Sequence, residues 1–139
     1  MRTFLHLLGW LLLVAVIVVG LPWLLARLAP TPGDANIGAG LAAFALLVVV
    51  SALGGFVEGS RLGLAAAVAL WTVPAVLVAV ATAYRLASEG HTFDTSLFLT
   101  ELPGTGLFLA VLTLVPATVG AAVAWGLRGT QDWPHERDA

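Results

Sequence analysis

The sequence predicts an all-α membrane protein, a polytopic four-helix bundle in which every helix crosses a lipid bilayer. Of the 139 residues, 60% are hydrophobic and only 10% are charged, whereas a soluble domain carries about a quarter charged residues. The mean hydropathy is +1.00. The apolar residues gather in four stretches, 4–26, 37–57, 62–84 and 105–127. At about 1.5 Å per helical residue, each stretch is long enough to cross a hydrocarbon core about 30 Å thick.

The four stretches and their connections account for the whole length, so we expect one transmembrane domain over 1–139. The first stretch is predicted to be a retained helix and not a cleaved signal peptide. Its apolar run exceeds the roughly 7–15 residues of a signal sequence, and Arg27 stands where cleavage requires a small residue.

The connections between the stretches carry turn signals. Pro30 and Pro32 cannot continue a helix, and Asp34 or Asn36 is suited to cap the second one. Residues 58–61 are expected to form a tight hairpin between antiparallel neighbours.

The one long connection, 88–104, is predicted to contain a short helix lying on the membrane surface, because its apolar run is too short for a fifth span. Asp94 or Thr95 is suited to cap this helix, and Pro103 with Gly104 is expected to end it. One side of the helix is apolar, with Phe93, Leu97, Phe98 and Leu102.

The arginines predict that both termini are cytoplasmic. Four of the six lie at the termini and the 58–61 hairpin, and two lie on the other side. The loop 88–104 then faces outward, and 128–139 forms a cytoplasmic tail. The absence of lysine and the abundance of alanine, valine, leucine and glycine indicate a bacterial cell membrane.

Several kinds of chemistry are excluded or disfavoured by composition. Without cysteine there are no disulfides, thiolate metal sites, iron–sulfur clusters or cysteine nucleophiles. The arginines are too dispersed for nucleic acid binding. No serine–histidine–carboxylate set, phosphate-binding loop or pair of catalytic acids is found, so neither an enzyme nor a cofactor is expected. The histidines lie near span ends or outside spans, which argues against haem: His6, His91 and His135.

The outer loop gathers one histidine and three carboxylates, which allows two interpretations. They are suited to ligate a divalent cation, or they form a solvated acidic loop. The solvated loop is favoured because the loop contains no second histidine and the chain contains no cysteine, so no metal is expected. These residues are Glu89, His91, Asp94 and Glu101.

Small residues recur at four-residue spacing, a pattern that lets helix backbones approach closely in a membrane. They either pack within the bundle, which is favoured, or form an interface with another subunit or copy. One series is Ser51, Gly55, Gly59 and Gly63; a second is Ala75, Ala79, Ala83 and Ala87. A third patch lies at Ala117, Thr118, Gly120, Ala121, Ala122 and Ala124.

Pro74 and Pro116 lie near the middles of the third and fourth spans. Each removes one backbone donor and frees one carbonyl, and Thr72 and Thr113 are placed to satisfy the freed groups. The expected kinks are either structural, which is favoured, or they open a cavity for a transported substrate.

Glu58 and Arg61 are the charges nearest an apolar run on the cytoplasmic side. A solvated ion pair at a helix end is the favoured interpretation. The alternative is a carboxylate inside the membrane that couples transport to a proton or cation.

Two classes of function follow. The favoured one is a non-catalytic subunit or scaffold of a larger membrane complex, because the spans are almost free of charge and rich in small residues. The alternative is a small homo-oligomeric transporter or channel that uses Pro74 and Pro116, with Glu58, Arg61, Thr72 and Thr113 as polar groups. The expected partners are the lipid bilayer and other membrane subunits or further copies of the chain.

Overall fold

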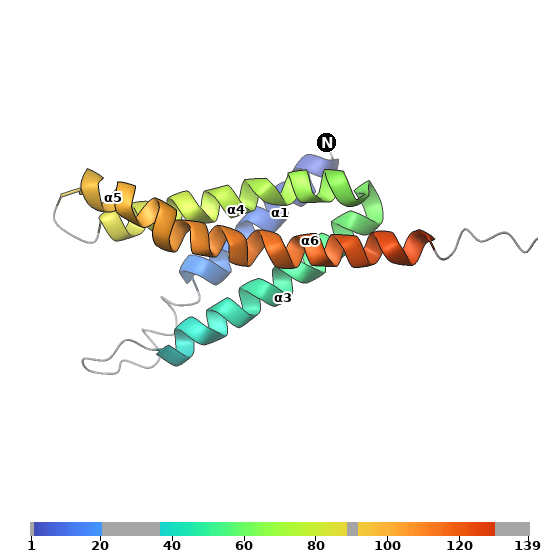
Figure 1. The fold of residues 1–139 in the computed structure, drawn as a ribbon, viewed down its shortest axis with the longest axis horizontal. Coiled ribbons are helices and arrows are strands. Elements are labelled where there is room, and N and C mark those ends of the chain that lie inside the picture. The colour runs from blue at the N-terminus through green and yellow to red at the C-terminus, as the bar shows by residue number, and fades with distance from the viewer. Residues whose placement is uncertain (1, 21–36, 89–91, 130–139) are drawn as a thin grey trace, which may run out of the picture.

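The computed structural model describes residues 2–20, 37–88 and 92–129, and these residues form helices and no strand. The elements are α1 (Arg2–Ala15), the π-helical η1 (Val16–Gly20), α3 (Ile37–Leu62), α4 (Leu64–Ala87), α5 (Thr95–Glu101), the π-helical η2 (Leu102–Gly106) and α6 (Leu107–Gly129). Figure 1 shows α4 and α6 side by side, with α3 crossing α6. The all-α prediction is confirmed.

Three helical segments are long and apolar enough to cross a membrane: Gly40–Leu62, Leu64–Ala87 and Thr95–Gly129. The first expected span, 4–26, is helical as far as Gly20, and 21–26 lie outside the described residues. Length and composition therefore support a helical membrane protein, and the fourth span stays a prediction.

The closest contact in the fold joins α3 to α6. A Cβ atom added to Gly55 would overlap the backbone of Ala117, and one added to Gly59 would overlap Ala121. Gly120 makes the reciprocal approach to the backbone of α3. Both helices step forward by four residues between these contacts, so they run parallel, as Figure 1 also shows. Gly55 and Gly59 of the first small-residue series thus pack inside the chain, whereas a Cβ at Gly63 would have no atom within 4 Å.

The second series, on α4, also faces inward. Ala75, Ala79 and Ala83 are buried, and Gly106 of η2 lies so close to the carbonyl of Ala79 that a Cβ there would be strongly crowded. Small side chains therefore let α4 and η2 pack at short range.

The reversal between α3 and α4 occurs at Gly63, and the hairpin predicted at 58–61 is wrong. α3 continues to Leu62, and Gly63 is the single residue before α4 begins at Leu64. Its φ of 86° lies in the left-handed region that glycine tolerates. One glycine is enough for this turn, so Glu58 lies inside α3, one turn before the helix ends.

Pro74 and Pro116 lie inside α4 and α6, and both helices continue past them. The expected bonds from Thr72 and Thr113 to the carbonyls freed by these prolines are not formed. Each hydroxyl donates instead to the carbonyl four residues before itself, at 3.0 Å for Thr72 and 2.8 Å for Thr113. This is the usual bond of a helical threonine, because that carbonyl is the nearest acceptor.

The N-cap predicted for the short helix is confirmed. One carboxylate oxygen of Asp94 accepts hydrogen bonds from the backbone N–H of Ser96 at 2.9 Å and of Leu97 at 3.1 Å. Phe93, just before the cap, stacks on Tyr84 of α4 with ring centroids 5.4 Å apart. The cap and the ring contact together fix the start of α5 beside the end of α4.

The predicted end of that helix at Pro103 and Gly104 is wrong. η2 carries the helical path from α5 directly into α6, so Thr95–Gly129 is one continuous segment. Pro103 lies in the first turn of η2. A π-helical turn is wider than an α-helical one, and such turns absorb local departures from regular hydrogen bonding. The short helix is therefore an extension of α6 that packs on α4.

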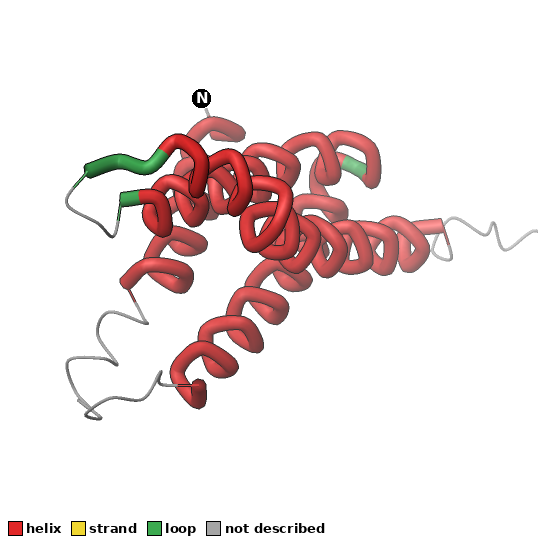
Figure 2. Tube along the Cα trace, turned by 60° about the vertical axis from the view of Figure 1, so that its left-hand side comes forward, coloured by secondary structure: helices red, strands yellow, loops and turns green. Residues whose placement is uncertain are grey.

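The buried core lies where α1, α3, α4 and α6 meet, and Trp71 is its largest fully buried side chain. Towards its N-terminus α3 diverges from α4 and α6 (Figures 1 and 2). A cavity of about 220 Å³ lies in this part of the fold, between Phe44, Thr82 and Leu109. The described core residues that pack together are Val14, Ile17, Leu47, Trp71, Val78, Leu109 and Ala117.

Gly55→Ala is expected to lower the free energy of unfolding by about 1–3 kcal/mol, because the added methyl group forces α3 away from α6. Gly40→Ala is the matched control on the same helix, since a Cβ there has no atom within 4 Å. Alanine has the higher helix propensity, so the control is expected to be neutral or stabilising. Unfolding in mild detergent, followed by circular dichroism, measures both, and equal effects would contradict the close contact.

The Asp94 cap is expected to weaken on acidification. Hydrogen bonds from the Ser96 side chain and the Leu97 backbone lower the pKa of Asp94. Because the folded pKa lies below the unfolded one, the stabilisation is present above the unfolded pKa and is lost as pH falls through the folded pKa. Hydrogen-exchange protection at Ser96 and Leu97 should fall accordingly.

Asp94→Asn is the control for this titration, because asparagine still caps the helix and does not ionise. It should retain protection at all pH values, and Asp94→Ala should lose it at all pH values. A pH response that persists in Asp94→Asn would show that another group controls the start of α5.

Candidate functional site

The most unusual side chain of the described structure is a carboxylate inside the bundle. Glu58 of α3 has only 2% of its surface exposed, and it lies in a helix long enough to cross a membrane. This differs from the expected solvated ion pair with Arg61. Burial of a carboxylate is unfavourable without hydrogen-bond or charged partners, so the groups around Glu58 decide what it does.

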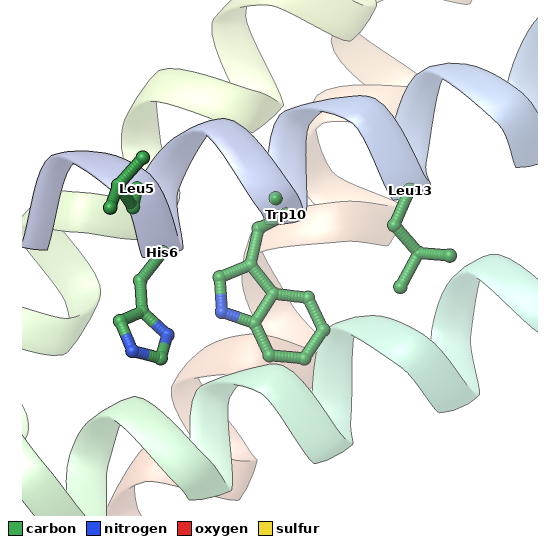
Figure 3. A pocket seen from close by; sticks show the side chains of 5 residues that line it. Leu5, His6, Trp10 and Leu13 are labelled. Atoms are coloured by element: carbon green, nitrogen blue, oxygen red, sulfur yellow. The ribbon is translucent and has the colours of Figure 1, made fainter. Parts of the chain in front are cut away.

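Two side chains of α1 contact Glu58. The indole Nε1 of Trp10 donates a hydrogen bond to its Oε1 at 3.1 Å. The Nδ1 of His6 lies 3.6 Å from the same oxygen. His6 and Trp10 are four residues apart and therefore share one face of α1, and Figure 3 shows both rings pointing from α1 toward α3.

Arg61 reaches the carboxylate only through the histidine. Its Nη1 lies 2.9 Å from Nε2 and 3.3 Å from Nδ1 of His6. His6 has 42% of its side chain exposed, whereas Glu58 is enclosed. The three groups thus form a chain from the surface to the interior, in the order Arg61, His6, Glu58.

An open groove of about 330 Å³ runs along α1 beside this cluster. His6 and Trp10 form its polar and aromatic part, and Leu5 and Leu13 form its apolar ends (Figure 3). Gly9 lies between them, and a Cβ added there would have no atom within 4 Å. The groove gives the His6 ring open space next to the buried carboxylate.

Trp10 is held from a second side by Trp71 of α4, with ring centroids 5.4 Å apart. Trp71 in turn lies over Gly54, where any Cβ would overlap its ring. Gly54 is one turn before Glu58 on α3, so a residue without a side chain makes the room that both indoles occupy. Ring packing and the hydrogen bond to Glu58 together fix the Trp10 side chain.

The other edge of α1 is also open. A second groove of about 280 Å³ lies between α1 and α4, beside Leu12, Pro74 and Val78. α1 is therefore flanked by space on both sides, in contrast to the tight contact of α3 with α6. Near this end α1 is joined to α3 by polar side-chain contacts, those of Trp10 and His6 with Glu58 and that of His6 with Arg61.

Of the predicted polar residues, Glu58 and Arg61 belong to this cluster, and Thr72 and Thr113 do not join it. Thr72 is exposed on α4 and Thr113 is buried on α6. Sequence reasoning missed His6 and Trp10 as partners of Glu58. The available signal was their four-residue spacing on an otherwise apolar helix.

The outer loop gains no support as a cation site. Glu89 and His91 lie outside the described residues, Asp94 caps α5, and Glu101 accepts a hydrogen bond from the Thr105 hydroxyl at 2.6 Å. Within the described ranges, no group of three or more histidine, aspartate or glutamate side chains is placed to hold a metal ion.

No protein-family model matches the chain, and no curated protein or solved structure gives a significant match. Function must therefore be argued from the site itself.

Trp10→Phe is expected to lower the free energy of unfolding by about 1–3 kcal/mol, because it removes a hydrogen-bond donor from a buried carboxylate. Trp125→Phe is the matched control, since Trp125 is 60% exposed on α6. Denaturation in mild detergent measures both. In a Glu58→Gln background the effect of Trp10→Phe should shrink, and an undiminished effect would assign it to ring packing alone.

Proposed function

We propose that this chain is a small membrane transporter that works as a homo-oligomer and uses Glu58 to bind a coupling or transported cation. The observation that carries the proposal is the burial of Glu58 in a helix of membrane-spanning length. Ionisable residues at such positions are energetically unfavourable, and in membrane proteins they mark ion pathways and proton relays.

The contacts of α1 support a movement of this helix relative to α3. The buried carboxylate contacts α1 through Trp10 and His6, and both edges of α1 border open grooves. Neutralising Glu58 would weaken its attraction for these two side chains and change the contact between α1 and α3. A ligand shifts a conformational equilibrium only through such a difference in contacts.

The position of the grooves supports a homo-oligomer. The groove beside His6 and Trp10 opens along the side of α1, so a second copy packed against α1 would enclose it. Pro74 lines the groove on the other edge. This gives the proline a place in the proposed pathway, because a residue without a backbone donor leaves a weak point in α4.

A second candidate, the non-catalytic subunit of a larger membrane complex, is favoured by the same open edges. The series at Gly55, Gly59 and Ala79 pack inside the chain, so they are not available as a partner surface. The surface for a partner helix would be α1 around Gly9, where nothing fills the space above the backbone. A small residue between leucines allows close approach of another helix.

Reconstitution into liposomes tests the first candidate. A homo-oligomer should move protons or a cation down a gradient, and Glu58→Gln should abolish this flux. Glu101→Gln is the matched control, because Glu101 lies at the end of α5, away from the Glu58 cluster, and accepts a hydrogen bond from the Thr105 hydroxyl. Equal flux in the wild type and Glu58→Gln would contradict the transport proposal.

Purification in mild detergent separates the two candidates. Unrelated chains that co-purify with the wild type and are lost in Gly9→Leu, without any flux, would support the subunit function. Gly55→Leu is not suitable for this purpose, because a side chain at Gly55 disrupts the contact of α3 with α6.

A further inference from the structure

We infer that the ligand of Glu58 is a proton, that His6 carries it between the surface and the carboxylate, and that Arg61 positions the imidazole for this step. The inference rests on the site of the proposed function, and it deepens that function by naming the ion and its route.

The neighbours of Glu58 argue against a metal cation. The groups closest to its carboxylate are the indole N–H of Trp10 and the imidazole of His6, and beyond them lies the guanidinium of Arg61. These are hydrogen-bond donors or cations, whereas calcium and magnesium require several oxygen ligands. The described part of the chain places no set of metal-binding side chains here. A proton needs only one oxygen.

A larger organic cation does not fit the geometry either. Glu58 is almost fully enclosed, and the groove on α1 is bordered by His6 and Trp10 and not by the carboxylate. The exposed imidazole of His6 stands between the open groove and Oε1 of Glu58. Imidazole is the side chain that gains and loses a proton most readily near neutral pH, so it is suited to this position.

The contact with Arg61 positions the imidazole of His6. A guanidinium only donates hydrogen bonds, and its Nη1 lies 2.9 Å from Nε2 and 3.3 Å from Nδ1. Whichever of the two nitrogens carries the lone pair of the neutral ring can accept this bond. Arg61 thus holds the ring where its Nδ1 lies 3.6 Å from Oε1 of Glu58.

The proton reaches Glu58 in two steps. Arg61 releases the ring, and a hydronium ion at its exposed side protonates the nitrogen that carries the lone pair, which gives an imidazolium and leaves water. The Nδ1–H bond breaks as an O–H bond forms on Glu58, and the ring is left neutral with its proton on Nε2. A separation of 3.6 Å exceeds a hydrogen bond, so the half-exposed ring must rotate slightly or a water molecule must bridge the gap.

The bond from Arg61 is incompatible with the imidazolium, because both groups then only donate hydrogen bonds. The Arg61–His6 contact therefore belongs to the states in which the ring is neutral. The ionisable groups of this cluster are His6 from α1 and Glu58 and Arg61 from α3. Among the described residues, α4 and α6 bring no charged side chain into hydrogen-bond or ion-pair contact with them.

The experiment uses the full chain in lipid nanodiscs without any gradient. Infrared spectroscopy follows the carboxylic acid band that disappears in Glu58→Gln, and nitrogen NMR follows the protonation of the His6 ring across a pH titration. We expect the nitrogen signals of His6 to change in step with protonation of Glu58. His6→Gln should slow proton exchange at Glu58 by about 100-fold, and Arg61→Gln should also slow it, because the ring loses the contact that holds it beside the carboxylate.

Arg128→Gln, at the end of α6, is the matched control and should change neither signal. His6→Phe is a second variant in case His6→Gln unfolds. A Glu58 that never protonates while the chain stays folded, or exchange that is unaffected by both His6 variants, overturns the inference. If the linked titration is seen without any flux, the proton route is supported and only the transport function is contradicted. If flux depends on Glu58 but the linked titration is not seen, the transport function is supported and the proton route through His6 is overturned.

Discussion

The architecture depends on the direct approach of two helix backbones, α3 and α6, at Gly55, Gly59 and Gly120. In a bilayer, apolar side chains gain little by leaving lipid for protein, so helices associate through close packing. Glycine on one helix opposite alanine on the other permits contact along two turns. This contact sets the parallel orientation of α3 and α6, and α4 then packs against α6 on its return path.

Glu58 lies on the same helix as this contact, between Gly55 and Gly59, and its side chain meets α1. Two different kinds of interaction therefore meet on neighbouring positions of α3. Toward α6 the helix uses van der Waals contact of small groups, which has no dependence on charge. Toward α1 it uses a carboxylate and its donors, which does. The two faces of α3 thus hold their neighbours by different physical interactions.

Local sequence predicted what local physics controls. Hydropathy predicted the three described helices of membrane-spanning length, and the chemistry of Asp94 predicted the start of α5. The reversal at Gly63 was misplaced because one glycine with positive φ suffices where a longer turn was assumed. Pro103 did not end a helix because η2 accommodates it. The environment of Glu58 was missed because Trp10 lies 48 residues away in sequence, and only the folded chain shows that α1 covers that face of α3.

The one-residue link at Gly63 also has a mechanical consequence. The N–H of Gly63 donates to the carbonyl of Gly59, and the carbonyl of Gly63 accepts from the N–H of Ala67. Helical hydrogen bonds thus reach Gly63 from both sides, and α3 and α4 are joined without slack. A displacement of either helix along its axis is therefore passed directly to the other at this end, and the contacts of both with α6 restrain it further. α1 has no such link to α3 or α4, and grooves border both of its edges.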